Sequence, residues 1–351
     1  MIYRVRAALI LLAIAGAIVP VPAAWVERLY SRTLYPALQS RVTSLSNLTP
    51  LALLDIASMT ALVLLAAALA RDWRALGPRR AALRAGARLV TGAAVVYVLF
   101  LITWGMNYRR VPLEARLDFD RTRISREALR QFATIAIERV NAGYADAHAA
   151  SFQADSLEHS FADAQRLLGG SRVATTGRPK RSLVGLYFRY AAMDGMTVPV
   201  FLEVILNPDI LPVEKPSVLA HEWAHLAGYA DESEANFLAW ISCVRSVDPV
   251  ARYSAWLDAY LLATNALPRE MRAALPSLDN GPRQDLSDIA ARYARSSLFV
   301  RSAARGVYDS YLKANRVEEG IANYAVVLQL LLGTRFDDDW APRLGSGRPN
   351  G

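Results

Sequence analysis

The sequence predicts a mainly α-helical protein in two parts: three membrane-spanning helices at the N-terminus, then a mostly helical α+β domain with a small sheet. Hydrophobic residues make up 53% of the 351 positions, above the roughly 45–50% of soluble domains. The excess is concentrated in three apolar runs, each near the ~20 residues that cross a bilayer as a helix. The remaining chain is long enough to bury a core of its own.

The three apolar runs predict transmembrane helices at about residues 5–24, 51–70 and 89–106, so residues 1–106 form a membrane anchor. The first run follows Arg4 and Arg6 and resembles a signal peptide, but it is long for one and two further spans follow. Asp55 lies one turn inside the second span, where its carboxylate is expected to reach the interface.

A basic loop at residues 71–88 predicts the orientation of the spans. It holds six arginines: Arg71, Arg74, Arg79, Arg80, Arg84 and Arg88. Arginine and lysine beside spans stay on the cytoplasmic side. We therefore expect a multi-pass protein of the cytoplasmic (inner) membrane, with the N-terminus and this loop inside and the large domain on the extracytoplasmic, periplasmic side. Three arginines in the outer loop 25–50 oppose this orientation but are outnumbered. The net charge of +8 is thus explained by membrane topology, and no nucleic-acid partner is expected.

Residues 107–335 predict the second domain, and residues 336–351 a polar, disordered tail. Helical spacing begins at Ile124, where Ser125 is a suitable cap, and continues to Leu168. Residues 183–210 are rich in β-branched and aromatic side chains, which favours a small sheet or hairpin. Helices are expected again at residues 217–228, 231–246, 251–266, 283–297, 299–314 and 317–332.

The main chemical signal is His221-Glu222-Trp223-Ala224-His225. Two histidines four residues apart lie on one helix face and can bind one ion, while Glu222 is rotated by about 100° and can reach a water on that ion. The single cysteine excludes a thiolate cluster. The flanking residues are apolar, so the helix is expected to be buried, and buried imidazoles need partners. The alternative is a surface helix with solvated side chains. The motif predicts one Zn²⁺ ion.

Zinc chemistry needs a third protein ligand, because catalytic sites combine three ligands with one open position. Gly228 suits a left-handed turn that ends the motif helix. Asp231 stands where a metzincin places its third ligand, but those enzymes also need a methionine turn, and only Met271 lies downstream. Glu234, on a second helix, is the preferred ligand, although it could instead form a capping pair with Asp231. Asp231 then caps the helix, and Asn236 is an outer partner that orients ligands.

Segments on both sides of the motif carry a family resemblance: His221 to Ala230, Glu232 to Phe237, Trp104 to Arg110, Arg252 to Ser254, Tyr311 to Asn315, Gly320 and Tyr324. They resemble DUF3810, a bacterial membrane family regarded as zinc-dependent peptidases. The resemblance implies a zincin-like, gluzincin-like domain in which the glutamate of Glu234-Ala235-Asn236 is the third ligand. The run Val198 to Glu203 departs from the family's pattern, which puts the substrate-binding strand in doubt.

A donor that stabilises the developing oxyanion is also expected. Tyr324 is our candidate, with Asn315 and Arg252 behind it. The alternative for Tyr324 is a place in the core with its hydroxyl satisfied locally.

The sequence therefore predicts a membrane-anchored zinc metallopeptidase, a hydrolase of peptide or protein substrates. In it, Glu222 is the general base for a zinc-activated water. Two alternatives stay open. One is an amidase or cell-wall hydrolase that acts on non-peptide substrates with the same water chemistry, and the other is a non-catalytic membrane protein in which the metal is structural.

Overall fold

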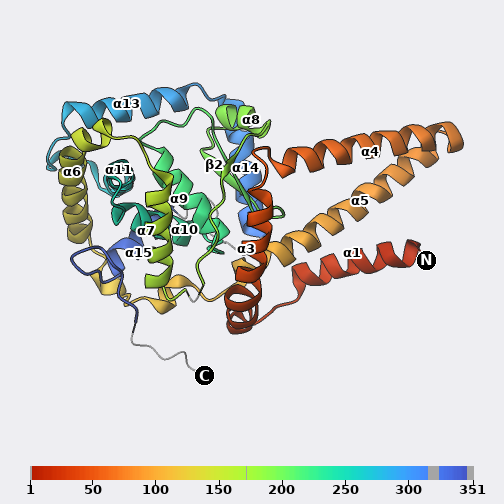
Figure 1. The fold of residues 1–351 in the computed structure, drawn as a ribbon, viewed down its shortest axis with the longest axis horizontal. Coiled ribbons are helices and arrows are strands. Elements are labelled where there is room, and N and C mark those ends of the chain that lie inside the picture. The colour runs from red at the N-terminus through yellow and green to blue at the C-terminus, as the bar shows by residue number, and fades with distance from the viewer. Residues whose placement is uncertain (1, 171, 315–323, 346–351) are drawn as a thin grey trace.

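The computed structural model describes residues 2–170, 172–314 and 324–345, and most of them are helical, as predicted (Figure 1). The helices are α1 (Ile2–Ile18), α2 (Ala23–Trp25), the π-helix η1 (Val26–Leu34), α3 (Tyr35–Ser46), α4 (Leu53–Leu76), α5 (Pro78–Thr103), the 3-10 helices η2 (Gly105–Arg109), η3 (Leu113–Arg116) and η4 (Arg121–Arg123), α6 (Arg126–Ala149), α7 (Ala154–Leu167), α8 (Val184–Ala191), α9 (Lys215–Leu226), α10 (Glu232–Val244), α11 (Pro249–Ala266), α12 (Arg269–Ala273), α13 (Asn280–Ala294), α14 (Leu298–Ala314) and α15 (Tyr324–Gly333). The strands are β1 (Pro179–Lys180), β2 (Gly195–Val198) and β3 (Glu203–Leu206).

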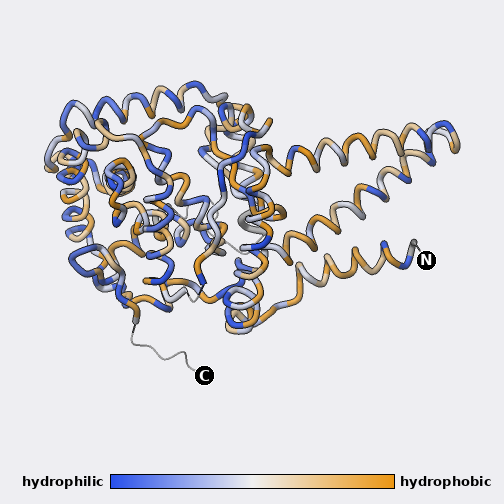
Figure 2. The backbone as a smooth tube through the Cα atoms, in the orientation of Figure 1, coloured by the Kyte–Doolittle hydropathy of each residue, from blue (hydrophilic) through white to orange (hydrophobic). Residues whose placement is uncertain are grey.

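Three apolar helices project from one side of the larger domain (Figures 1 and 2). By length and composition, α4 and α5 are each able to cross a membrane. A third candidate is a bent pair made of α1 and the helical run from Ala23 to Ser46, with 112° between its two arms. The chain thus carries two candidate membrane spans, or three if the bent pair counts as one span.

The basic segment between the second and third spans is not a loop. Helix α4 continues to Leu76 and α5 begins at Pro78, so the arginines lie on the two helix ends around Gly77, which has a φ of 75°. Asp72 is buried there and forms an ion pair with Arg88 at 2.6 Å. The helices extend further than predicted because arginine and alanine favour helix and no residue other than Gly77 stops it. The N-terminus and this tight turn lie at the same end of the projecting helices (Figure 1).

Residues 25–50, expected to be an outer loop, form helices that pack on the larger domain. The Tyr35 hydroxyl donates to the Leu226 carbonyl at 2.7 Å, and Thr43 Oγ1 donates to the Leu202 carbonyl at 2.9 Å. Both tyrosine and threonine are buried. These long-range hydrogen bonds attach α3 to the domain, and local turn signals in the sequence do not indicate them.

Two carboxylates join the start of α4 to the same domain. Glu203 of β3 is fully buried and accepts hydrogen bonds from the backbone N–H groups of Leu53 and Leu54, at 2.8 and 2.9 Å. It thereby satisfies two of the free donors at the α4 N-terminus. The second carboxylate, Asp55, belongs to α4 itself and accepts hydrogen bonds from Ser182 Oγ and the Leu183 N–H of the domain, at 2.9 and 2.8 Å. Asp55 therefore contacts the domain.

The larger domain combines helices with one small sheet, in the strand order β1-β3-β2. Strands β2 and β3 are antiparallel, which confirms the predicted hairpin, and β1 pairs parallel to β3. The prediction was wrong for Val184–Ala191, which forms helix α8 because Val184 and Phe188, four apart, pack on one core cluster. The helical spacing read from Ile124 to Leu168 corresponds to two helices, α6 and α7, and Ser125 caps the first as predicted.

The core surrounds α9 and α10, which pack on each other and are enclosed by α7, α11 and α15 (Figure 1). The tail predicted to be disordered from residue 336 is ordered as far as residue 345. Phe336 and Trp340 lie in an aromatic cluster with Trp240 and Trp256, with ring centroids 5.2–5.9 Å apart. Burial of those two aromatic rings outweighs the polar, Gly/Pro-rich composition of the tail. Residues 346–351 lie outside the described part.

Candidate metal centre

Helix α9 carries the His-Glu-x-x-His motif in a buried setting, as predicted. Pro216 occupies its first turn, and Glu222 and His225 are 4% and 7% exposed. The helix ends at Leu226, and Gly228, two residues later, has a left-handed φ of 86°. A Cβ at this position would come within 2.9 Å of the Tyr35 ring. Glycine is therefore needed at this turn for both its conformation and its size, and the turn returns the chain toward the histidines.

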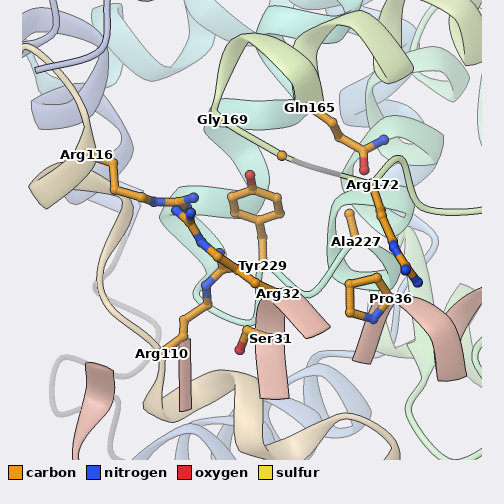
Figure 3. A pocket seen from close by; sticks show the side chains of 11 residues that line it. Ser31, Arg32, Pro36, Arg110, Arg116, Gln165, Gly169, Arg172, Ala227 and Tyr229 are labelled. Atoms are coloured by element: carbon orange, nitrogen blue, oxygen red, sulfur yellow. The ribbon is translucent and has the colours of Figure 1, made fainter. Parts of the chain in front are cut away.

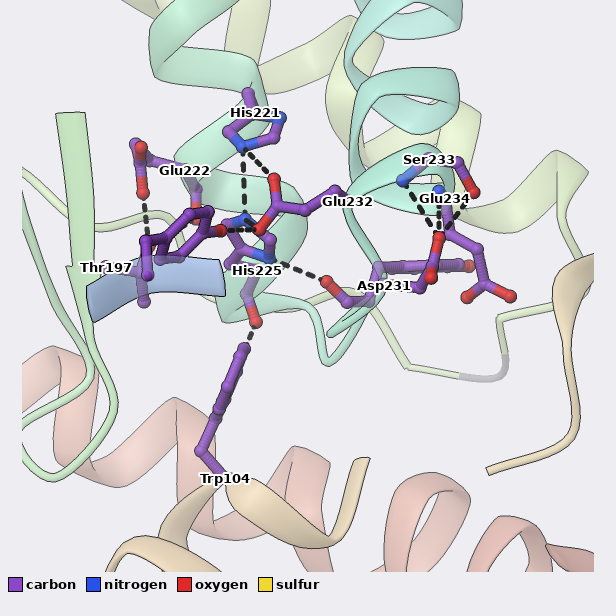
Figure 4. A network of polar contacts seen from close by, with 11 residues as sticks. Trp104, Thr197, His221, Glu222, His225, Asp231, Glu232, Ser233 and Glu234 are labelled. Atoms are coloured by element: carbon purple, nitrogen blue, oxygen red, sulfur yellow. Dashed lines mark hydrogen bonds and ion pairs between the residues drawn. The ribbon is translucent and has the colours of Figure 1, made fainter. Parts of the chain in front are cut away.

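The carboxylate that joins the two histidines as the third member of the cluster is Glu232 (Figure 4). His221 Nε2 and His225 Nε2 are 3.1 Å apart. Glu232 Oε2 lies 3.3 Å from His221 Nε2, and Glu232 Oε1 lies 3.4 Å from His225 Nε2. Among the described residues, these three form the group of His, Cys, Asp and Glu side chains with ligand atoms close enough for one ion.

Glu234, the ligand expected from the sequence, is directed elsewhere. Its carboxylate accepts a hydrogen bond from the Leu113 N–H at 2.5 Å, near Arg110. On a helix, residues two apart differ by about 200° in direction, so Glu232 and Glu234 occupy opposite faces of α10. The face toward α9 carries Glu232. Asp231 was expected either as the alternative ligand or as the cap of the second helix. It caps α10, and its carboxylate accepts hydrogen bonds from the Ser233 and Glu234 N–H groups at 2.9 and 3.2 Å.

The three groups fit a zinc ion. Ligand atoms about 2.0–2.2 Å from a tetrahedral ion are about 3.3 Å from one another, and the observed separations are 3.1–3.4 Å. The charges also match. Burial opposes ionisation of Glu232, but the two histidines hold the pKa of its carboxyl well below its usual range. Burial likewise opposes protonation of His225, and Glu232 raises its pKa to about 9. Without an ion, protons on the histidines supply the positive charge beside the Glu232 carboxylate.

Hydrogen bonds from outside the cluster orient the ligands. His225 Nδ1 lies 2.8 Å from the Tyr229 carbonyl, which only accepts, so Nδ1 carries a proton and Nε2 is the nitrogen that faces the cluster. Trp104 Nε1 donates to the His225 carbonyl at 2.7 Å, from just beyond the end of α5. Such outer partners fix the tautomer and direction of metal-binding histidines.

Glu222 lies between α9 and strand β2, held by Thr197 (Figure 4). Thr197 Oγ1 donates to the Glu222 carboxylate at 2.8 Å. A Cβ at Gly195 would come within 2.7 Å of that carboxylate, so glycine leaves room for it. Burial raises the pKa of Glu222, and the nearby histidines oppose the rise. A carboxylate with a raised pKa is suited to accept a proton.

A tyrosine that the sequence analysis did not select also reaches the cluster. Tyr308 of α14 donates its hydroxyl to the Glu232 carboxylate. Burial, with the Glu232 charge, raises the pKa of Tyr308 and keeps it a donor. The only sequence feature that could have pointed to Tyr308 was its place on a predicted helix. The side chain of Tyr324 and the whole of Asn315 lie outside the described residues. Arg252 donates to the Ser246 carbonyl at 2.8 Å, at the start of α11.

The chain matches the model of one protein family over residues 30–332, described as "Protein of unknown function (DUF3810)". It belongs to the DUF3810 family. This confirms the resemblance read from the sequence. No curated protein and no solved structure matches the chain.

The DUF3810 match covers every part of the candidate centre. It begins at Tyr30, within η1, and ends at Leu332, within α15, so it includes the two candidate spans α4 and α5 and the helices that carry Glu222, Glu232 and Tyr308. Helix α1 precedes it. The match therefore covers both the two candidate spans and the candidate centre.

A small arginine-rich pocket is lined by Arg32, Arg110, Arg116 and Arg172 together with Tyr229, within the DUF3810 match (Figure 3). Arg110 is its most informative member. Its guanidinium binds the Glu27 carboxylate at 3.1 Å, donates to the Gly228 carbonyl at 3.0 Å and lies 4.9 Å over the Tyr229 ring. Since the Tyr229 carbonyl contacts His225 Nδ1, Arg110 connects helix η1, which carries Glu27, to the candidate ligand His225.

Asn236, expected as an outer partner of the ligands, is half-buried one turn after Glu232. It lines a small cavity between α9, α10, α11 and α15, together with Ser217 and Asp258. Ser217 is one turn before His221. Asn236 is therefore near the ligand helices, and its described surroundings are those of a cavity wall.

Proposed function

We propose that this DUF3810 protein is a membrane-anchored zinc peptidase in which one Zn²⁺ is held by His221, His225 and Glu232. The observation that carries the proposal is the separation of their ligand atoms, 3.1–3.4 Å, beside a buried glutamate one residue after the first histidine. The bound ion would supply an acidic water and polarise the scissile carbonyl. Three protein ligands leave a fourth position for that water, as in other catalytic zinc sites.

The protein's own groups supply proton transfer and charge stabilisation. Glu222 accepts the proton of the attacking water and delivers it to the leaving amine. Thr197 holds the carboxylate by one of its oxygens and so fixes its direction. Tyr308 brings a hydroxyl to the ligand cluster, and we assign it to donate to the substrate carbonyl oxygen as negative charge develops there.

The architecture supports a zincin-like domain outside the membrane. Helix α9 packs against β2 and β3, so a small sheet lies beside the motif helix, and the third ligand comes from the following helix α10. The arginines of the α4–α5 turn lie at the end of the projecting helices far from the domain (Figures 1 and 2). Because arginines favour the cytoplasmic side, this supports a domain on the extracytoplasmic face of the cytoplasmic membrane.

Metal analysis with cleavage profiling tests the proposal. The full-length protein in lipid nanodiscs is expected to contain about one zinc per chain and to cut members of a peptide library. A chelator should abolish cleavage without unfolding the domain, and added zinc should restore it. Unfolding on chelation with no cleavage by the loaded protein would support a structural metal. Cleavage of non-peptide amides alone would support the amidase.

Tyr308→Phe tests the assigned tyrosine. We expect kcat to fall by about 100-fold, in line with the loss of one oxyanion donor, with zinc content unchanged because no ligand is removed. Tyr260→Phe is the matched control, since Tyr260 is a half-buried tyrosine on α11. If both variants keep full activity, Tyr308 has no role in the reaction.

A further inference from the structure

Helix α8 exposes an apolar stripe to solvent. Four residues at the spacing i, i+3, i+4 and i+7 form it: Leu183, Leu186, Tyr187 and Tyr190, with exposed fractions of 68%, 60%, 45% and 50%. The opposite face holds Phe188, which is fully buried. The helix is therefore apolar on both faces, and only one of them has a partner within the described chain. A helix that is apolar all round is usually buried on both sides.

The stripe continues onto the start of α14. The Ser297 N–H donates to the Tyr190 carbonyl at 3.0 Å and joins the end of α8 to that helix. The next two residues, Leu298 and Phe299, are 74% and 83% exposed. We call these six side chains, the four of the stripe with Leu298 and Phe299, the α8–α14 patch. Large contiguous apolar patches on a protein surface mark binding sites for proteins or membranes.

The position of the patch identifies its partner. Its first residue, Leu183, donates its N–H to Asp55, in the first turn of the candidate span α4. The exposed apolar residues of α4 begin directly after, with Ile56 at 49% and Met59 at 55%. In Figure 1, α8 lies beside the start of α4. The patch is therefore continuous with the surface that α4 presents to lipid, at the level where that surface begins.

We propose that the α8–α14 patch lies in the interface of the bilayer that α4 and α5 enter, with its leucines and phenylalanine at the acyl boundary. Two of its members are tyrosines, which are enriched at this depth. Exposed arginines flank it, Arg181 before α8 and Arg295 before α14, as suits contact with anionic headgroups. The bilayer that surrounds α4 would already contact the adjoining patch, so a second copy or another protein would have to displace lipid in order to bind there.

This placement bears on the substrate, a consequence that rests on the proposed function. Helix α14 runs from the patch to Tyr308, which contacts Glu232. The metal centre is thereby held close to the membrane surface. The substrate class that fits is a polypeptide presented at the bilayer, such as the segment next to a membrane anchor.

Site-specific fluorescence tests the patch in the full-length protein. The single cysteine, Cys243, is fully buried, so an introduced cysteine can be labelled selectively. Leu186→Cys with an environment-sensitive dye is compared with Glu138→Cys, an exposed position on α6, at the far side of the domain from the spans (Figure 1). Both proteins are placed in phosphatidylethanolamine–phosphatidylglycerol nanodiscs, with and without lipids that carry a nitroxide near the headgroup.

We expect nitroxide lipid to quench the dye at position 186 at least severalfold more than the dye at 138, with a blue-shifted emission at 186 alone. Phe299→Ser should reduce the quenching at 186 while leaving the thermal transition unchanged. Equal quenching at the two positions would overturn the proposal. If the emission at position 186 is blue-shifted without being quenched by nitroxide lipid, and the shift grows with the number of chains per disc, the patch binds a second copy of the chain. The measurement needs no catalysis, so its failure is separate from failure of the peptidase proposal.

Discussion

Replacing Glu222 with glutamine is expected to leave one zinc in the protein and to lower peptide cleavage by about 10²–10⁴-fold, the range for loss of a general base. The amide keeps the size of the side chain and can still accept the Thr197 hydrogen bond. It cannot take a proton from water at neutral pH. Zinc content, the thermal transition and kcat/KM, measured on the same preparation, check this result.

Glu138→Gln, on the exposed surface of α6, is the control for loss of one carboxylate. It should retain full activity. If Glu222→Gln retains wild-type kcat/KM, Glu222 is not the base. If it loses zinc as well as activity, the residue acts on the metal and the division of roles along α9 must be redrawn.

A pair of alanine variants separates the two glutamates of α10. Glu232→Ala is expected to weaken zinc binding by more than about 100-fold, because even loss of outer partners of a metal site costs 10–100-fold. Glu234→Ala should keep zinc affinity. It instead leaves the Leu113 N–H without its acceptor, which costs about 1–3 kcal/mol of stability. Zinc affinity by competition with a chromophoric chelator, together with thermal unfolding of the metal-free proteins, measures both effects.

The two variants serve as controls for each other, since they remove the same group from one helix, two residues apart. A loss of zinc in Glu234→Ala with normal binding in Glu232→Ala would contradict the geometry of the centre and restore the ligand expected from the sequence. Loss in both variants would mean that α10 must be intact as a unit to hold the ion.

The features that the sequence determined are those with a local cause. Residues four apart on a helix share a face whatever surrounds them, so His221 and His225 had to converge if the segment was helical. Gly228 and Asp231 had turn and cap roles that depend on the backbone within a few residues, and the structure confirms both. The second and third apolar runs likewise indicated helices long enough to span, because length and hydropathy suffice for that inference. The first run, predicted at residues 5–24, forms a helix only to Ile18 and is a candidate span only together with the bent helical run that follows it.

Tertiary packing decided which side chains complete the centre. Both Glu232 and Glu234 are close to the two histidines in the sequence, and which of them joins the histidines in space depends on which face of α10 meets α9. That face is set by distant contacts, including those of the other face with Leu113 and Arg110. Tyr308 lies on a helix more than 70 residues later, and no local pattern relates it to Glu232.

The same division applies to the fold. The Val184–Ala191 segment has β-branched and aromatic residues, so local propensity favoured a strand. It became α8 because Phe188 is buried in the core cluster and Asp55 binds the start of the helix, from a span more than 120 residues earlier. The sequence by itself therefore determined two apolar helices long enough to span a membrane, the motif helix and its two histidines. Only the tertiary structure decided that Glu232 faces them, because helix rotation and long-range burial are properties of the packed chain.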